Sequence, residues 1–336
     1  MEIPIVITHF VKPQTYCPDG AAAAWVVAKA YNFNVEVHGE VYRQEKDWER
    51  MYQYSGGSLL MLPYDPRDRD IILVDWAGYP VELMVLLQRH AKSITILDHH
   101  KTRVEDLNQL GSLSNLYYGY VPTELGCGAS IAWNYYFPLD DPPWFIKYVR
   151  SRDTNRGGFW QGKLPEHEAV NFAIGNLRKG IKSQTDLFTV FDYLYTIAEW
   201  ELDIDAGVKQ VDFKNEVCWD EVRRWELDPS YIELNDAYGY LVRGDLSDLQ
   251  KPDHIDLSVP CCQIVNPSAD RFYSWVGTYL SEVNPDAPFV VIKTSQGGND
   301  LSVHLRKPLA SDADCGAIAR YFGGGGHADA AGFPLT

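Results

Sequence analysis

The chain has 336 residues, of which 46% are hydrophobic and 13% aromatic, so it can bury a large core, and its length favours two domains. This composition excludes a disordered or fibrous protein. The formal net charge of −16 disfavours a long nucleic acid as partner, because nonspecific binding to such a polymer depends on Lys and Arg side chains that neutralise its phosphates.

The six cysteines include no Cys-x-x-Cys pair, and two of them are adjacent, which fits neither a disulfide framework nor a zinc cage. The N-terminus has no basic region followed by a long apolar stretch, and no apolar run approaches the roughly 18 residues of a membrane span. We therefore expect a soluble, cytoplasmic protein that does not bind a membrane.

Three short apolar runs in the first hundred residues are typical of buried parallel strands: 3–7, 71–74 and 94–97. Helical patterns at 21–31 and 81–92 occupy the intervals. The repeated order of strand, helix and strand predicts an α/β protein whose N-terminal domain has a mainly parallel sheet flanked by helices.

Polar side chains follow each apolar run: His9 after the first, Asp75 after the second, and Asp98, His99 and His100 after the third. Ligands of open parallel sheets bind beyond the carboxyl ends of the strands, so these side chains should share one rim. Imidazole and carboxylate groups suit Mn²⁺, Mg²⁺, Fe²⁺ or Zn²⁺ better than metals that prefer thiolates. Asp75 could bridge two such ions.

The middle of the chain reads as mainly helical, and a small α/β unit follows it. Helical patterns cover 124–137, 142–152, 166–177 and a long stretch at 185–225, whereas β patterns occupy 239–242, 262–265, 289–292 and 301–305. A hairpin turn is expected at 296–300 and a helix at 314–322. The predicted division is a first domain at 1–185, a helical linker at 186–228 and a smaller C-terminal α/β domain at 229–336.

Two acidic residues outside the strand ends have both an ordinary and a functional interpretation. Asp19, in Cys17-Pro18-Asp19-Gly20, could simply cap the alanine-rich helix that follows it. Asp153 precedes a glycine-containing turn that it could stabilise. Neither residue indicates a metal site by its local pattern alone.

The C-terminal glycine run is harder to explain structurally. A flexible hinge is the ordinary interpretation of Gly323 to Gly326, but four glycines also leave backbone N–H groups open to a phosphate or a base, and His327 follows them directly. Arg306 could grip a phosphate with its planar guanidinium, although a surface salt bridge is the usual role of such an arginine.

Taken in order, these motifs resemble those of the DHH phosphoesterase family, in the subgroup that carries a C-terminal substrate-binding domain with a Gly-Gly-Gly-His signature. The resemblance covers most of the chain. The matching motifs are His9, Cys17-Pro18-Asp19-Gly20, Val74-Asp75, Asp98-His99-His100-Lys101, Arg152-Asp153-Thr154, Leu305-Arg306 and the segment at 318–333.

The resemblance implies two divalent ions, usually Mn²⁺, although Mg²⁺ or another divalent ion could take their place. Asp75 would bridge the ions, His9 would bind one of them, and Asp19, His99 and Asp153 would bind the other. The family often has an Asp-x-Asp pair in its first motif, whereas Cys17 stands two residues before Asp19 here. If Cys17 does not bind metal, the first ion lacks one carboxylate and should be held more weakly.

The resemblance also implies roles around the substrate. Asp98 would orient a histidine, as metal-binding imidazoles usually require, and His100 would face the substrate phosphate. The second domain would hold the nucleotide through Arg306, Gly324, Gly325, Gly326 and His327.

The expected activity is Mn²⁺-dependent hydrolysis of short oligonucleotides or cyclic dinucleotides to mononucleotides. One alternative is a single-strand exonuclease of the RecJ type, which would need a basic, aromatic groove that the composition does not indicate. Another is a nucleotide-binding regulatory protein whose first metal site has decayed through Cys17. A homodimer, the exact substrate and the direction of cleavage are left open.

Overall fold

The computed structural model describes residues 2–12, 15–40, 62–77, 81–100, 107, 115–121, 126–154, 165–227, 230–233, 258–295 and 301–335. The chain forms two compact units, Met1–Val211 and Asp212–Thr336. The three-part division expected from the sequence remains a prediction.

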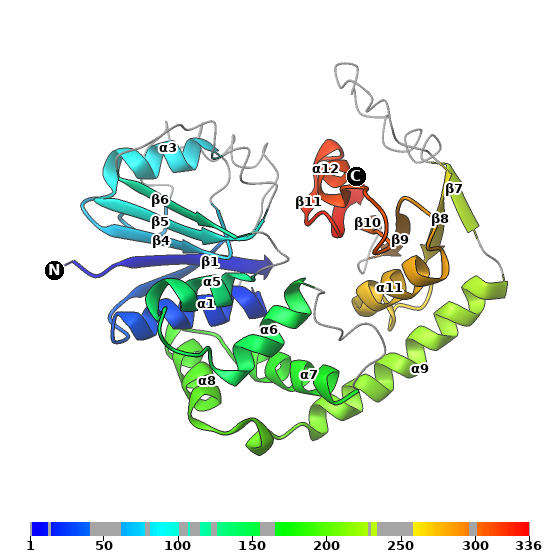
Figure 1. Ribbon diagram of the computed structural model, residues 1–336, viewed down its shortest axis with the longest axis horizontal. Helices are drawn as coiled ribbons and strands as arrows, with labels where there is room; N and C mark the ends of the chain where they lie inside the picture. Colours follow the sequence, from blue (N-terminus) through cyan, green and yellow to red (C-terminus); the bar gives the residue numbers. More distant parts are fainter. Residues whose placement is uncertain are drawn as a thin grey trace. The chain divides into compact units, whose positions relative to one another are not determined.

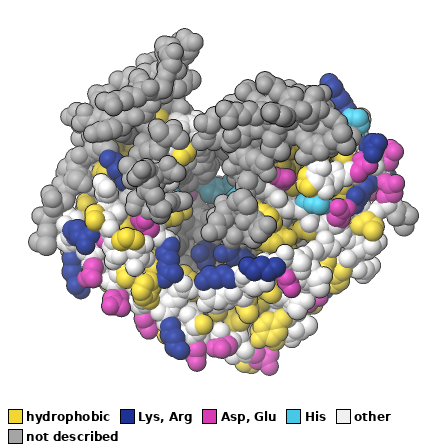
Figure 2. Space-filling model, turned by 180° about the vertical axis from the view of Figure 1, so that it is seen from behind, with side chains coloured by type: hydrophobic (Ala, Val, Ile, Leu, Met, Phe, Trp, Pro, Cys, Tyr) yellow, Lys and Arg dark blue, Asp and Glu magenta, His cyan; other side chains and the backbone are white. Residues whose placement is uncertain are grey.

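On the face seen in Figure 2, Lys and Arg side chains gather in a row among scattered acidic side chains, so the net charge of −16 does not produce a uniformly acidic surface.

A sheet of six strands forms the centre of the first unit, and five of them run parallel (Figure 1). The order is β2-β1-β4-β5-β6, with β3 also paired to β1, and β2 is the antiparallel member. The prediction of an α/β fold with a mainly parallel sheet is confirmed. The strands are β1 (Ile5–Lys12), β2 (Thr15–Tyr16), β3 (Glu36–Glu40), β4 (Asp70–Val74), β5 (Ser93–Asp98) and β6 (Leu116–Tyr120).

Helices cover both faces of this sheet. Helices α1 and α5 lie on one face and α3 lies on the other (Figure 1), so Ile72 and Val74 of β4 pack on the first face and Ile71 and Leu73 on the second. This is why the strand is an unbroken apolar run. The helices are α1 (Pro18–Ala30), α3 (Val81–His90), α5 (Gly128–Tyr136), α6 (Trp144–Thr154) and α7 (Pro165–Lys179).

The predicted strands at 3–7, 71–74 and 94–97 are β1, β4 and β5, and each predicted helix up to 177 has a counterpart. Residues 124–125 of the helix expected at 124–137 lie outside the described part of the chain. Strands β3 and β6 were not expected. β3 (EVHGE) contains charged and polar residues, and β6 (LYYGY) consists mainly of tyrosines with a glycine, so neither is a run of aliphatic residues.

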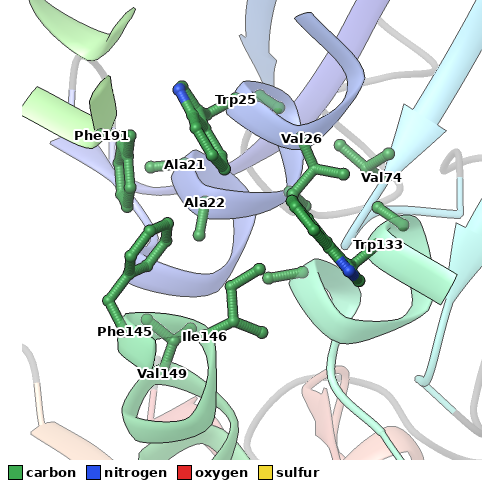
Figure 3. Packing of buried hydrophobic residues seen from close by; sticks show 14 of the residues in the cluster. Ala21, Ala22, Trp25, Val26, Val74, Trp133, Phe145, Ile146, Val149 and Phe191 are labelled. Carbon is green, nitrogen blue, oxygen red and sulfur yellow. The ribbon is translucent and has the colours of Figure 1, made fainter. Parts of the chain in front are cut away.

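Helix α1 is buried around its whole circumference. Every residue from Ala21 to Ala28 is 0% exposed. The small alanines let neighbouring elements approach closely, and Trp25 packs with Trp133, Phe145 and Phe191 from three other helices (Figure 3). This packing fixes the N-terminus of α1, where Asp19 lies.

The helical stretch expected at 185–225 is interrupted. It consists of α8 (Gln184–Thr196), a 3₁₀ turn at Glu199–Glu201 and α9 (Asp205–Leu227). The chain is extended at Ile197 and Ala198, and the Glu201 carboxylate accepts a hydrogen bond from the backbone N–H of Ala198, which stabilises the break.

The second unit contains a six-stranded sheet in the order β11-β12-β10-β9-β8-β7, antiparallel except for the β8–β9 pair. Helix α11 packs on β9 and β10, and α12 packs on β12. The elements are β7 (Ser230–Glu233), β8 (Ser258–Gln263), α11 (Tyr273–Val283), β9 (Val290–Ser295), β10 (Leu301–Arg306), α12 (Cys315–Tyr321), β11 (Gly325–Gly326) and β12 (Ala330–Leu335).

The strand expected at 239–242 and the turn expected at 296–300 lie outside the described residues. The strands predicted on either side of that turn are β9 and β10, and they pair antiparallel. Helix α11 and strand β12 were not expected from the sequence. Across the described residues, no helix combines the length and apolarity needed to cross a membrane.

Candidate metal centre

The carboxyl ends of β1, β4 and β5 bring three of the candidate side chains together. Thr8 pairs with Val74, so His9 and Asp75 follow at neighbouring positions on adjacent strands. The Asp75 N–H donates to the carbonyl of Leu97 at 3.1 Å, which places Asp75 beside the end of β5 and hence beside His99. Asp75 has a φ of +54°, in the left-handed region, and is 1% exposed. Buried backbone strain of this kind is typical of functional sites.

Three carboxylates converge on the buried imidazole of His99. Its Nε2 lies 3.2 Å from Asp75 Oδ1, 3.2 Å from Asp153 Oδ2 and 3.7 Å from Asp19 Oδ2. Burial alone would lower the pKa of His99, but the carboxylates of Asp153, Asp75 and Asp19 outweigh it and raise that pKa to about 10. The site therefore favours a positive charge at this point.

Asp19 is placed by a helix that begins more than a hundred residues later. Its carboxylate accepts the backbone N–H groups of Gly128 at 2.5 Å and Ala129 at 2.8 Å, at the N-terminus of α5. It therefore binds the end of α5, and the N-cap position of its own helix is held by Cys17. Burial, together with Asp75 and Asp153, raises the pKa of Asp19 well above its ordinary value.

Two groups of potential ligand atoms result, and Asp75 lies between them. His9, Cys17 and Asp75 form one group, and Asp19, His99 and Asp153 form the other; within each, the ligand atoms lie within 4.8 Å of one another. One oxygen of Asp75 approaches His99, and the other, Oδ2, lies 3.8 Å from His9 Nδ1. Within the described part of the chain, Oδ2 is buried and makes no hydrogen bond. This arrangement can hold two ions with a shared carboxylate.

Asp98 and His100 form a pair at the edge of this cluster. The two groups approach to 2.7 Å through Nδ1 of His100 and Oδ1 of the fully buried Asp98. Burial would raise the pKa of Asp98, but His100 and His99 outweigh burial and lower it. The histidine that Asp98 holds is thus His100.

Two glycines that the sequence did not single out as site residues allow the cluster to close. A Cβ on Gly20 would lie 2.6 Å from Thr8 Oγ1 and 3.2 Å from Asp75 Oδ2. A Cβ on Gly128 would lie 2.7 Å from Asp75 Cβ and 2.9 Å from Asp19 Oδ2. Gly20 stands in the first motif, whereas Gly128 offers no comparable signal in the sequence. Both are required by the close approach of α1 and α5 to Asp75.

Arg178, at the end of α7, is a further neighbour that the sequence did not indicate. Its guanidinium donates to the carbonyl of Tyr16, which places a positive charge beside Cys17. Burial lowers the pKa of Arg178, partly offset by Cys17. No local pattern connects residue 178 with the first motif, so only the fold could reveal this contact.

In the second unit, Arg306 is buried rather than exposed on the surface. Its guanidinium donates to Ser274 at the start of α11, and no ion pair to it occurs among the described residues. His304, two residues earlier, stacks on Tyr273 with ring centroids 3.6 Å apart. Burial, with a contribution from Arg306, lowers the pKa of His304 to about 4.

The glycine run has a packing function in the structure. A Cβ on Gly324 would lie 2.1 Å from the carbonyl oxygen of Gly332, and a Cβ on Gly326 would lie 2.7 Å from that of Ala330. Gly325 and Gly326 form β11 against β12, and the His327 N–H donates to Ala330. Contact of Gly324, Gly325, Gly326 and His327 with a ligand remains a prediction.

Comparison with curated proteins finds two distant relatives. The chain is 25% identical over 256 residues to oligoribonuclease NrnB of Bacillus subtilis, a match that covers 72% of this chain and 53% of NrnB. The ordered motifs and this match agree. Both support a likeness of this chain to the DHH phosphoesterases. The chain is also 22% identical over 349 residues to the uncharacterized protein R106 of Acanthamoeba polyphaga mimivirus, covering all of this chain and 68% of R106.

Comparison with solved structures also finds similar chains. The pGpG-specific phosphodiesterase PggH from Vibrio cholerae aligns over 100% of this chain and 94% of its own, with 13% identity and a TM-score of 0.46. Exonuclease RecJ bound to manganese aligns over 99% of this chain and 86% of its own, with 14% identity and a TM-score of 0.36. No family model matches the chain. The chain spans about half the length of NrnB. An activity of the whole protein is therefore only proposed below.

Proposed function

We propose that the chain is a divalent-metal-dependent phosphodiesterase that hydrolyses short oligonucleotides or cyclic dinucleotides to mononucleotides. The observation that carries the proposal is Asp75, a buried carboxylate at a strand end with one oxygen toward His99 and the other toward His9. Oligoribonuclease NrnB, by its name, acts on short RNA, which supports this substrate class.

The donor set fits two divalent cations. Three buried or partly buried carboxylates, those of Asp19, Asp75 and Asp153, lie near one imidazole, and Oδ2 of Asp75 makes no hydrogen bond among the described residues. Buried carboxylates are costly unless paired or bound to metal. Oxygen and imidazole donors suit Mn²⁺, which we propose as the ion, and also Mg²⁺.

Each of the clustered residues would have a separate role in metal binding or proton transfer. Asp75 would hold both ions at a fixed separation, with His9 on one and Asp19, His99 and Asp153 on the other. Divalent ions supply polarisation of the phosphoryl oxygens and a lowered pKa for an attacking water. Asp98, through its contact with Nδ1 of His100, would fix that ring so that Nε2 can meet the phosphate and give a proton to the leaving oxygen.

The second unit would bind the nucleotide. The guanidinium of Arg306 is held in place by Ser274 and has no ion pair in the described residues, so a phosphate could supply the missing negative charge. His327 and Gly324 to Gly326 would contact the same nucleotide. His304 lies two residues before Arg306 on β10, and Tyr273, on which it stacks, precedes the Ser274 that Arg306 contacts. These rings would suit a base near the phosphate.

A substrate series tests the proposal. After EDTA treatment and addition of Mn²⁺, the full chain would be incubated with dinucleotides, cyclic dinucleotides, single strands of increasing length, phosphorylated adenosine nucleotides and polyphosphate. We expect mononucleotide release to be fastest from the shortest substrates, since the net charge of −16 disfavours long strands.

Two other results would contradict this proposal in different ways. Faster cleavage of long single strands would indicate an exonuclease of the RecJ type. Tight nucleotide binding by calorimetry, with no Mn²⁺-dependent product from any substrate, would indicate a regulatory binding protein.

A further inference from the structure

Cys17 lies at the first metal-binding group, in the place where the superfamily's first motif often has an aspartate. The backbone N–H of Cys17 donates to the carbonyl of His9 at 3.1 Å, so the two residues are fixed side by side although seven residues separate them. The thiol sulfur, a ring nitrogen of His9 and a carboxylate oxygen of Asp75 all lie within 4.8 Å of one another. The three side chains thus surround one position.

A second observation marks this position as a ligand site. Asp75 is 1% exposed, and its Oδ2, the oxygen on the side of His9, makes no hydrogen bond to any described residue. A buried carboxylate oxygen that makes no hydrogen bond, with an imidazole nitrogen 3.8 Å away, suits a cation in the adjacent space.

We infer that Cys17 binds the first divalent ion through its sulfur, together with His9 and Asp75. The inference rests on the proposed metal centre and deepens it. The first ion would then have nitrogen, sulfur and oxygen donors, whereas the second, at Asp19, His99 and Asp153, has only nitrogen and oxygen donors. Because thiolates favour softer ions, the first position should prefer Zn²⁺, Fe²⁺ or Co²⁺, and the second should accept Mn²⁺ or Mg²⁺.

The segment that carries Cys17 is held in place by a distant helix. The guanidinium of Arg178, at the end of α7, donates to the carbonyl of Tyr16, the residue before Cys17. This contact and the bond from the Cys17 N–H to the carbonyl of His9 fix the backbone on both sides of the thiol.

The ordinary interpretation of Cys17 is a small residue before a helix. Cys17 occupies the N-cap position of α1, but its side chain makes no capping hydrogen bond to the described residues. Cys127 is the matched comparison, because it is also an N-cap residue, of α5, and it lies near Asp19. Cys127 belongs to none of the groups of potential metal ligands found among the described residues.

Cobalt spectroscopy of the full chain tests the inference without reference to turnover. Metal-free protein would be titrated with Co²⁺, and the near-ultraviolet charge-transfer band of a thiolate bound to Co²⁺ would be recorded. We expect the band in the wild type and in Cys127→Ala, and its loss in Cys17→Ser and Cys17→Asp. Cys17→Asp should still bind Co²⁺, as measured by calorimetry, since a carboxylate replaces the thiolate.

The outcomes separate this inference from the proposed function. A band that persists in Cys17→Ser, or Co²⁺ binding to the wild type with no band, would overturn the role of Cys17 and leave the metal centre intact. Failure of the wild type to bind Co²⁺, Mn²⁺ or Zn²⁺ at all would overturn both. Competition of Zn²⁺ against Mn²⁺ gives an independent measure: Cys17→Asp should lose preference for Zn²⁺, and an unchanged preference would contradict the inference.

Discussion

Asp75 combines an unusual backbone conformation with a side chain that contacts two histidines. Its left-handed φ of +54° turns the chain at the end of β4, and its two carboxylate oxygens then approach His99 and His9 on either side. The sequence predicted Asp75 as a shared ligand because it follows a buried strand. The turn itself, and the glycines that leave room for it, could be learned only from the structure.

Gly128→Ala tests how tightly this cluster is packed. Alanine is normally preferred to glycine in a helix, but here its Cβ would lie 2.7 Å from Asp75 Cβ and 2.9 Å from Asp19 Oδ2. We expect the displaced carboxylates to weaken Mn²⁺ binding roughly 10–100-fold, as for other residues that orient metal ligands. Equilibrium dialysis would measure the affinity of each variant for Mn²⁺. Gly175→Ala is the control, since its Cβ would meet only Arg152 at 3.7 Å, and equal affinities of the two variants would contradict the prediction.

His304 should make stability depend on pH. Its pKa is about 4 in the folded protein and near 6.5 when unfolded, so between these values the unfolded chain binds a proton that the folded chain does not. Folding stability should therefore fall as the pH is lowered from about 6.5 to 4, by roughly 3 kcal/mol at most. Urea unfolding across this range would measure the slope.

His304→Asn removes the titrating ring and should flatten that part of the profile. The exposed His90 on α3 offers a matched variant, His90→Asn, which should keep the wild-type slope. An unchanged slope in His304→Asn would show that its ring does not resist protonation in the folded state.

At the scale of elements, apolar patterns predicted the strands and helices that build the core. Strands β1, β4 and β5 carry uninterrupted apolar runs because helices cover both faces of the sheet. The edge strands β3, with charged residues, and β6, with tyrosines and a glycine, lack that aliphatic pattern, so they were missed. Contacts such as Asp19 with α5, or Arg178 with Tyr16, join distant segments and have no local signal.

Trp25→Ala would test the packing that positions α1. Trp25 is fully buried and stacks with Trp133 (Figure 3). Its indole N–H donates a hydrogen bond to Asp192 at 2.9 Å. Its removal should lower the free energy of unfolding by about 3–5 kcal/mol. Trp200→Ala, at a side chain 87% exposed, should change it by less than about 0.5 kcal/mol. Similar unfolding midpoints for the two variants would contradict the packing described for α1.

At the scale of the whole molecule, the net charge is compatible with the short substrates of the proposed function. The charge of −16 disfavours long polyanions, and under the proposed function divalent ions at the Asp75 cluster would supply the positive charge that a short phosphodiester needs. The sequence predicted a likeness to DHH phosphoesterases and the candidate ligands, and the structure brings His9, Asp19, Asp75, His99 and Asp153 together. Their role as ligands, like the exact substrate, is a matter for experiment, because it depends on ions that sequence patterns do not specify.

The most direct test is the Mn²⁺-dependent rate of dinucleotide hydrolysis in Asp75→Asn, with bound Mn²⁺ counted in parallel. Asparagine keeps the size of Asp75 but removes the shared charge, so we expect fewer bound ions and a rate lower by at least about a thousandfold. Asp70→Asn, at the other end of β4 and hydrogen-bonded to Ser93 and Lys92, should keep the wild-type rate. Wild-type activity in Asp75→Asn would contradict the account.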